Sequence, residues 1–132
     1  MASRTWRGRE VMSSIRGGSQ RNIRDATLEG LSAVNRKLRR NTPTGEVYRV
    51  SGTQRLYRAS APGEPPANRT GGYANSFQPR YRNNEGLIGT KDKRGPWLEF
   101  GTRRMAARPH LRPALSGASR RLRAILSRRV TE

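Results

Sequence analysis

The sequence contains no cysteine, one histidine and nine acidic residues among its 132 positions. Without cysteine there are no disulfide bonds or thiolate metal ligands, on which small secreted domains depend for stability, so we expect a reducing setting. Apolar residues make up 32% of the chain and aromatic residues 6%. The apolar share is below the roughly 45–50% of ordinary domains, a figure that also counts glycine. We therefore predict a thin core, to whose stability neighbouring copies or partners contribute.

Long apolar runs are also missing. No segment approaches the length of a membrane span, and the arginine-rich start lacks the apolar segment of a secretory signal. The sequence therefore predicts a soluble protein without membrane contacts, which stays in the cytoplasm until it is built into an assembly.

Residues with the chemistry of an active site are few and scattered. The single histidine, His110, has no histidine, cysteine or acidic residue beside it in the sequence, and Glu99 is the nearest acid. The glycine-containing segments lack the order of a phosphate-binding loop, a dinucleotide-binding turn or a nucleophile elbow. We expect neither catalysis nor a metal or cofactor site, and interpret His110 as structural.

Basic residues are abundant instead. Lysine and arginine number 28 against nine acids, which gives a net charge of +19, and nearly all of the basic residues are arginine. Arginine forms bidentate contacts with phosphates and carboxylates. The expected partners are therefore DNA or acidic protein surfaces.

The hydrophobic pattern predicts one α+β domain, with a helix before and a helix after a small antiparallel sheet. Residues 1–19 are rich in arginine, serine and glycine, and we expect a basic, weakly ordered arm there, preceding a single domain over 20–132. Apolar residues at helical spacing predict a helix over about 20–40. Their counterparts near the end predict a second helix over about 112–129.

Between these helices the sequence predicts short strands and a long loop. Short strand pieces are expected within 47–61, with a turn at Ser51 and Gly52. Residues 61–72 are so rich in proline and glycine that they predict an extended loop suited to reaching a neighbour. Three strands are expected over about 77–100, the last of them over residues 96–100.

Two segments of this chain resemble a known family. Residues 60–67 read S-A-P-G-E-P-P-A, and residues 98–102 and 107–114 read L-E-F-G-T and A-R-P-H-L-R-P-A. With Thr70-Gly71 and Ser76, they resemble, in order, the tail-completion or head-tail joining proteins of long-tailed bacteriophages, also called "gene-ten-like" morphogenesis proteins. The resemblance covers roughly the C-terminal two-thirds of the chain.

The resemblance implies a structural virion protein of the phage neck that acts by assembly. Such a protein would form a homo-oligomeric ring, with sixfold symmetry expected for a long-tailed neck. It would complete the tail and join it to the DNA-filled head, in contact with the connector or stopper and the tail terminator. Packaged double-stranded DNA would pass through the lumen and be contacted non-specifically, and assembly would take place in the host cytoplasm.

We expect subunit or ring contacts in the proline-rich loop and around the second motif. The expected interface residues are Pro62, Gly63, Pro65, Pro66, Trp97, Leu98, Glu99, Phe100, Arg103, Arg104, Arg108 and Arg112. Strand alternation would place Glu99 on the face opposite its two apolar neighbours. Two roles are open for its carboxylate: a solvent-facing salt bridge, or a pair with an arginine of the next subunit.

The predicted C-terminal helix carries a cluster of basic residues, Arg120, Arg121, Arg123, Arg128 and Arg129. Three roles are open for this cluster: a solvated helix face, a surface facing DNA, or a contact with an acidic ring. An alternative for the whole protein is a basic protein that binds nucleic acid non-specifically through phosphates. That alternative explains the charge but leaves both motifs unexplained.

Overall fold

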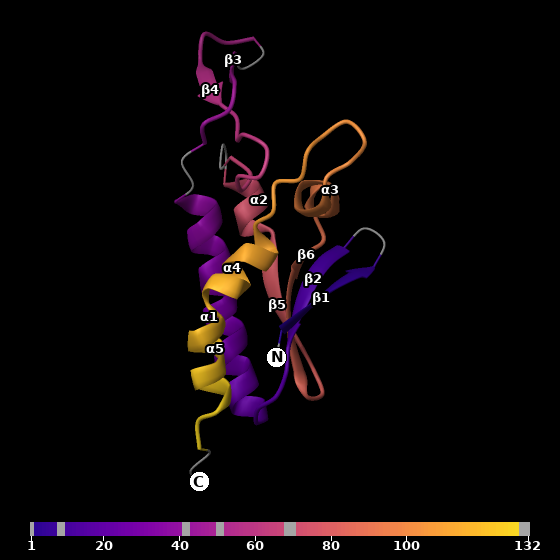
Figure 1. The fold of residues 1–132 in the computed structure, drawn as a ribbon, viewed down its shortest axis with the longest axis vertical. Helices are drawn as coiled ribbons and strands as arrows, with labels where there is room; N and C mark the ends of the chain where they lie inside the picture. Colours follow the sequence, from indigo (N-terminus) through magenta and orange to yellow (C-terminus); the bar gives the residue numbers. More distant parts are fainter. Residues whose placement is uncertain (1, 8–9, 41–42, 50–51, 68–70, 130–132) are drawn as a thin grey trace.

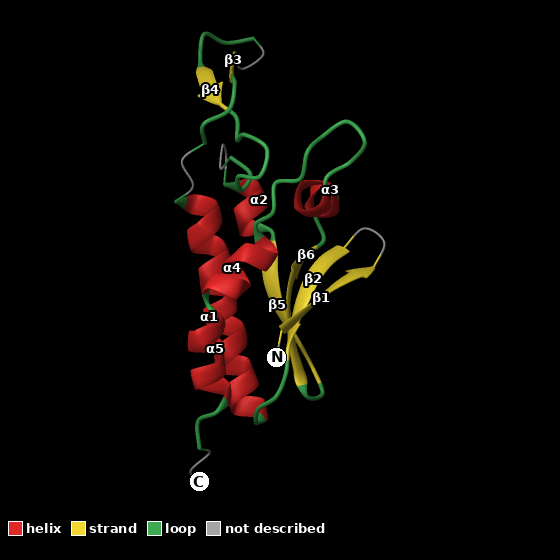
Figure 2. Ribbon diagram, viewed as in Figure 1, coloured by secondary structure: helices red, strands yellow, loops and turns green. Residues whose placement is uncertain are grey.

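The computed structural model describes residues 2–7, 10–40, 43–49, 52–67 and 71–129. The fold is α+β, as the sequence predicts, with an antiparallel sheet packed against helices (Figures 1 and 2). In spatial order the sheet contains β1 (Ala2–Arg7), β2 (Glu10–Ile15), β6 (Glu85–Thr90) and β5 (Phe77–Arg82). The helices are α1 (Gln20–Arg39), α2 (Gly72–Asn75), α3 (Arg94–Phe100), α4 (Leu111–Gly117) and α5 (Ser119–Leu126).

The prediction of a weakly ordered basic arm over residues 1–19 is wrong for the part of this segment that the structure describes. These residues form β1 and β2, and β2 lies inside the sheet between β1 and β6. Ile15 is fully buried, and Ser13 and Ser14 are also buried. Pairing with β6 satisfies the backbone of β2, and this tertiary contact outweighs a local composition typical of flexible segments.

Helix α1 confirms the first predicted helix. Ser19 caps its start by accepting a hydrogen bond from the Asn22 N–H at 3.2 Å. The predicted stripe is buried at Ile23, Thr27, Val34 and Leu38, and Leu31 packs at its margin. This face lies against the sheet on one side and α4 and α5 on the other, so α1 is the central element of the core (Figure 1).

Small residues let α1 approach the sheet closely. A Cβ atom added at Gly30 of α1 would lie 2.6 Å from Cδ1 of Ile88, and one added at Gly86 of β6 would lie 1.8 Å from Oγ1 of Thr27. Real Cβ atoms do not approach other atoms so closely. Glycine at these two positions therefore sets the distance between helix and sheet.

The predicted C-terminal helix is correct in its buried stripe but wrong in its continuity. It consists of α4 and α5, which meet at Ala118, and α5 ends at Leu126 rather than near residue 129. Leu111, Leu115 and Leu122 join the core cluster with Ala118. The change of direction keeps α4 near the sheet while α5 runs beside α1 (Figure 1).

The last predicted strand is a helix. The hairpin of β5 and β6 matches the strands expected after residue 77, but residues 96–100 belong to α3. Proline is tolerated in a first helical turn, where Pro96 lies, and Gly101, with φ of 79°, follows the last residue of α3. Trp97 and Phe100, which a strand would place on opposite faces, are three residues apart in the helix and therefore share one face of α3.

A second, two-stranded sheet stands away from the body of the protein (Figure 1). The short strands expected within 47–61 are confirmed as β3 (Val47–Arg49) and β4 (Leu56–Arg58). Two backbone hydrogen bonds to Ala59 close its base: the Gly45 N–H donates to the Ala59 carbonyl, and the Ala59 N–H donates to the Glu46 carbonyl, both at 2.8 Å. We call the described residues 46–49 and 52–58 the projecting hairpin.

Candidate functional site

The two motifs that carry the resemblance meet in space. Arg108 donates from Nε to Oγ of Ser60 at 2.7 Å and from Nη2 to the Ser60 carbonyl at 3.2 Å. The Gly63 N–H donates to the Ala107 carbonyl at 3.0 Å. Segments more than 40 residues apart in the sequence therefore form one junction, in which Arg108 makes contacts within its own chain.

Hydrogen bonds to the Glu64 carboxylate also fix the proline-rich loop. Its carboxylate accepts hydrogen bonds from the Ala61 N–H at 2.6 Å and the Thr44 N–H at 3.1 Å. These two backbone donors, Ala61 first, lower the pKa of Glu64 below its usual value. The loop is thus tied to the residues that precede the projecting hairpin.

Only part of the expected loop interface faces outward. Pro62 and Gly63 are exposed, Pro65 is half-buried and Pro66 is buried. Gly63 has φ of 86°, a backbone conformation that favours glycine. The outward contact predicted for the loop can therefore involve Pro62 and Gly63 directly, while Pro66 belongs to the interior.

Glu99 has neither of the two roles expected from its sequence. The residue is 2% exposed, and its carboxylate lies at the start of α4. Oε2 accepts from the N–H groups of His110 at 2.8 Å and Leu111 at 3.1 Å, and Oε1 accepts from the Arg112 N–H at 3.0 Å. A carboxylate at this position satisfies the unpaired N–H groups of a helix start and complements its dipole. Glu99 is therefore an internal helix cap supplied by α3.

His110 is fully buried beside Glu99 and is completely hydrogen-bonded. Its Nδ1 lies 2.8 Å from the Arg108 carbonyl and 3.2 Å from Oε2 of Glu99, and its Nε2 lies 2.6 Å from the Tyr73 hydroxyl. A neutral ring protonated at Nδ1 satisfies these contacts: Nδ1–H donates to the carbonyl, and Nε2 accepts the hydroxyl proton. The rings of Tyr73 and Phe77 meet it edge to face at 5.3 and 5.8 Å.

Burial has the largest effect on the pKa values of His110 and Tyr73. It lowers the pKa of His110 from its usual 6.5, against the opposing effects of the Glu99 carboxylate and the Arg108 carbonyl. Burial also raises the pKa of the Tyr73 hydroxyl, with a further contribution from Glu99. Both side chains are therefore neutral at physiological pH, and their role is to join α2 to the start of α4.

His110 should make the protein less stable in mild acid. Its pKa is lower in the folded state than in the unfolded chain, so the unfolded chain binds the proton more readily, and stability is lost as pH falls below about 6.5. The free energy of unfolding should fall between pH 7 and pH 5 by up to about 1.4 kcal/mol per pH unit. Urea unfolding of the wild type and of His110→Asn measures this slope.

The chain has only one histidine, which makes the comparison direct. The variant should be less stable at neutral pH but should show a flatter dependence between pH 7 and pH 5. Equal slopes in the two proteins would show that His110 does not account for the dependence.

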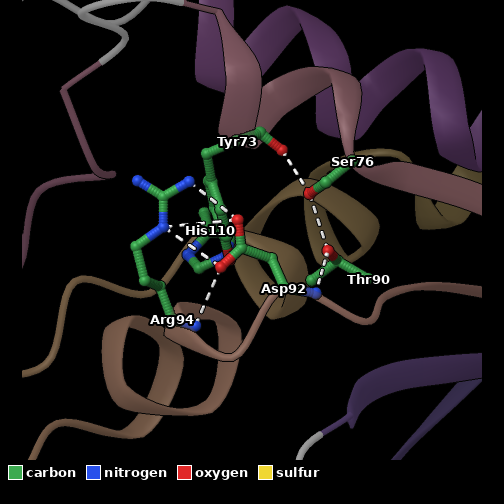
Figure 3. A network of polar contacts seen from close by, with 6 residues as sticks. All are labelled: Tyr73, Ser76, Thr90, Asp92, Arg94 and His110. Atoms are coloured by element: carbon green, nitrogen blue, oxygen red, sulfur yellow. Dashed lines mark hydrogen bonds and ion pairs between the residues drawn. The ribbon is translucent and has the colours of Figure 1, made fainter.

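A second polar network lies next to His110 and places α3 (Figure 3). Ser76 Oγ donates to the Tyr73 carbonyl and contacts Oγ1 of Thr90, both at 2.6 Å. Thr90 Oγ1 also accepts from the Asp92 N–H at 3.0 Å. Asp92 accepts in turn from Nη2 of Arg94 at 2.7 Å, and this contact lowers the pKa of its carboxyl group. The network fixes the turn between β6 and α3.

Helix α3 presents its aromatic residues to solvent. Trp97 is 50% exposed and Phe100 37%, whereas Leu98 is half-buried and Glu99 points inward. We call Trp97 and Phe100 the α3 patch. Of the interface residues expected around the second motif, these two have the apolar surface that an assembly contact uses.

The predicted arginines form two groups along the chain, one around α3 and the start of α4 and one on and after α5. Arg103 and Arg104 are exposed in the turn after α3, which a bridge between Thr102 and Met105 closes, and Arg112 is exposed on α4. The five arginines of the C-terminal cluster, for which a surface facing DNA is one of the three open roles, are all exposed on or just after α5. Two of them contact acids of α1: Arg121 lies 3.2 Å from Glu29, and Arg128 lies 3.9 Å from Asp25.

Comparison with models of protein families, with curated proteins and with solved structures finds no match for this chain. Within the described residues, no group of three or more histidine, cysteine or acidic side chains could hold a metal ion. The same part of the chain contains no helix with the length and hydropathy needed to cross a membrane.

Sequence reasoning missed two features of the site. The contact between Tyr73 and His110 joins positions 37 residues apart, and no local pattern indicates it. The exposure of the projecting hairpin was also missed, although its apolar and aromatic residues indicated strands. Val47 and Tyr48 are each 46% exposed and Leu56 is 65% exposed, so the pattern predicted the strands but not their distance from the core.

Proposed function

We propose that this chain is a structural virion protein of the bacteriophage neck. It forms a homo-oligomeric ring with copies of itself, completes the tail and joins it to the DNA-filled head. Its neighbours on this proposal are the connector or stopper and the tail terminator, and a sixfold ring is the expected symmetry. The function is assembly, and no chemical step or cofactor is part of it.

The main support for the proposal is the location of the exposed apolar side chains. Seven large hydrophobic residues are exposed among the described side chains. Five of them belong to the projecting hairpin and to the α3 patch: Val47, Tyr48, Leu56, Trp97 and Phe100. Both elements lie toward one end of the molecule (Figure 1), which we call the hairpin end. Exposed apolar residues gathered in this way are typical of protein contacts.

The junction of the two motifs supports the same proposal. Polar contacts of Glu64, Glu99, Arg108 and His110 tie the base of the hairpin and α3 to the rest of the fold, and Glu99 and His110 are themselves buried. A two-stranded hairpin has little stability of its own in water. Fixing its base and covering its apolar side chains with a neighbour would make it a stable part of a ring.

The state of the purified protein tests the proposal. Nucleic acid is removed at high salt, and the mass of the particles is measured by light scattering and their shape by electron microscopy. Closed rings of one size that contain no nucleic acid are expected. A protein that stays monomeric at every concentration, alone and with isolated tails, would contradict the proposal.

The alternative is a basic protein that binds nucleic acid non-specifically. The exposed arginines on and after α5 favour it, because their positive charge would attract phosphates of any base sequence. On that alternative the protein would form particles only when nucleic acid is added, and their size would follow the length of the nucleic acid.

A further inference from the structure

The end of the molecule opposite the hairpin has a different surface. Helix α1 begins there, α5 ends there, and the turn between β5 and β6 lies beside them (Figure 1). We call it the basic end. It contains a shallow pocket of about 260 Å³ lined by Arg16, Gly17, Arg123, Leu126 and Ser127.

A buried amide group builds this pocket. Asn22 is 5% exposed, and its Nδ2 donates to the carbonyl of Arg128 at 2.8 Å and to that of Leu126 at 3.4 Å. These bonds hold the end of α5 against the start of α1. Gly18 allows the close approach, since a Cβ atom there would lie 2.9 Å from the Leu126 carbonyl oxygen. Two arginines from distant parts of the sequence, Arg16 and Arg123, thereby line one pocket.

The charges around the pocket leave an excess of arginine. Glu85 lies between two arginines, with its carboxylate 3.0 Å from Nε of Arg16 and 3.7 Å from Nε of Arg82. Asp25 lies 3.9 Å from Nη1 of Arg128. Within the described part of the chain, no carboxylate is within ion-pair distance of Arg123 or Arg129. These five arginines, Arg16, Arg82, Arg123, Arg128 and Arg129, thus stand against two carboxylates.

We propose that the pocket between Arg16 and Arg123 binds a phosphate group of a nucleic-acid backbone. The guanidinium groups supply donors matched to phosphate oxygens, and the Ser127 hydroxyl and the Gly17 backbone complete the lining. Arg128 and Arg129 follow directly on the chain and meet neighbouring phosphates. The site belongs to the single subunit and does not depend on ring formation, so it can be tested separately from the proposed function.

The test measures binding of a fluorescent 30-base-pair DNA duplex by anisotropy at several salt concentrations. The variant Arg16→Gln/Arg123→Gln should lower the slope of log affinity against log salt by about 0.9, the contribution of the one phosphate that the pocket binds. At 0.15 M salt this corresponds to an affinity roughly 5-fold lower. The control Arg40→Gln/Lys93→Gln removes the same charge from exposed positions away from the basic end and should change affinity much less. Equal losses in both variants would overturn the proposal.

A second variant tests the pocket without removing the ion pair between Arg16 and Glu85. Ser127→Asp keeps both arginines and places a negative charge in the pocket, at an exposed position whose hydroxyl donates to the carbonyl of Arg123 in its own helix turn. Thermal unfolding should be nearly unchanged while DNA binding falls at least tenfold. Wild-type DNA binding by Ser127→Asp would contradict a phosphate in this pocket.

Competition distinguishes the sources of the ligand. Saturable shifts of the arginine Nε–H signals with inorganic phosphate, lost in Arg16→Gln/Arg123→Gln, would identify free phosphate as a ligand of the pocket. A different result is that inorganic phosphate displaces DNA no more than the same ionic strength of another salt does. Together with the variant effects above, that result would identify the nucleic-acid backbone as the ligand of the pocket. Displacement by polyglutamate as effective as displacement by unlabelled DNA would overturn the phosphate assignment and indicate an acidic protein partner.

Discussion

Replacing Glu99 by alanine is expected to lower the free energy of unfolding by about 3 to 5 kcal/mol. The change removes the acceptor for three N–H groups at the start of α4, and two of them belong to fully buried residues, His110 and Leu111. Each unsatisfied buried donor is expected to cost about 1–3 kcal/mol. The N–H of exposed Arg112 can bond to water instead. Urea unfolding followed by circular dichroism measures the loss.

Two further variants make this result specific. Glu99→Gln keeps one acceptor oxygen and should lose less stability than alanine, while remaining folded if the alanine variant does not. Glu46→Ala removes an exposed carboxylate that accepts a hydrogen bond from the Tyr48 hydroxyl in the projecting hairpin, and it should stay within about 0.5 kcal/mol of the wild type. A loss below 1 kcal/mol for Glu99→Ala would show that water replaces the cap.

The case of Glu99 shows what a short sequence pattern can miss. Residues 96–100 form an apolar run that fits both a strand and a helix, and such runs cannot be separated by periodicity. Gly101, in the left-handed region at φ of 79°, is the local signal that favours a helix end. The partner groups of Glu99 lie 11 to 13 residues later, in a helix whose start depends on the fold.

Long, regular patterns predicted more of the structure. The stripe of α1 runs from Ile23 to Leu38, about four turns at 3.6 residues each, and all its residues but the partly buried Leu31 are buried, because an amphipathic helix turns its apolar face to the core. The strands at the start of the chain were missed for the opposite reason. The buried residues Ser13 and Ser14 give β2 no apolar alternation, and its place in the sheet depends on pairing with β6, more than 70 positions away.

The exposure of Trp97 changes the result expected when it is replaced. A buried tryptophan would cost about 3–5 kcal/mol on replacement by alanine, but Trp97 is half-exposed on α3. Since burial of a whole large apolar side chain contributes about 1.5–3 kcal/mol, Trp97→Ala should destabilise the isolated subunit by about 1 kcal/mol. Its main effect should be on association between subunits or with neighbouring proteins.

At the centre of a protein contact, an aromatic residue of this kind contributes at least about 2 kcal/mol, which corresponds to roughly 30-fold weaker association. Trp97→Ala should therefore shift rings toward smaller species in light scattering and reduce tail joining in extracts, while thermal unfolding of the subunit changes little. Tyr81→Ala is the matched control, because Tyr81 is 42% exposed on β5 and contacts Arg24 away from the α3 patch. Tyr81→Ala should assemble normally. If Trp97→Ala also assembles and joins tails at the wild-type level, the α3 patch is not an assembly surface, and the projecting hairpin, tested by Leu56→Ser, would have to supply the contact alone.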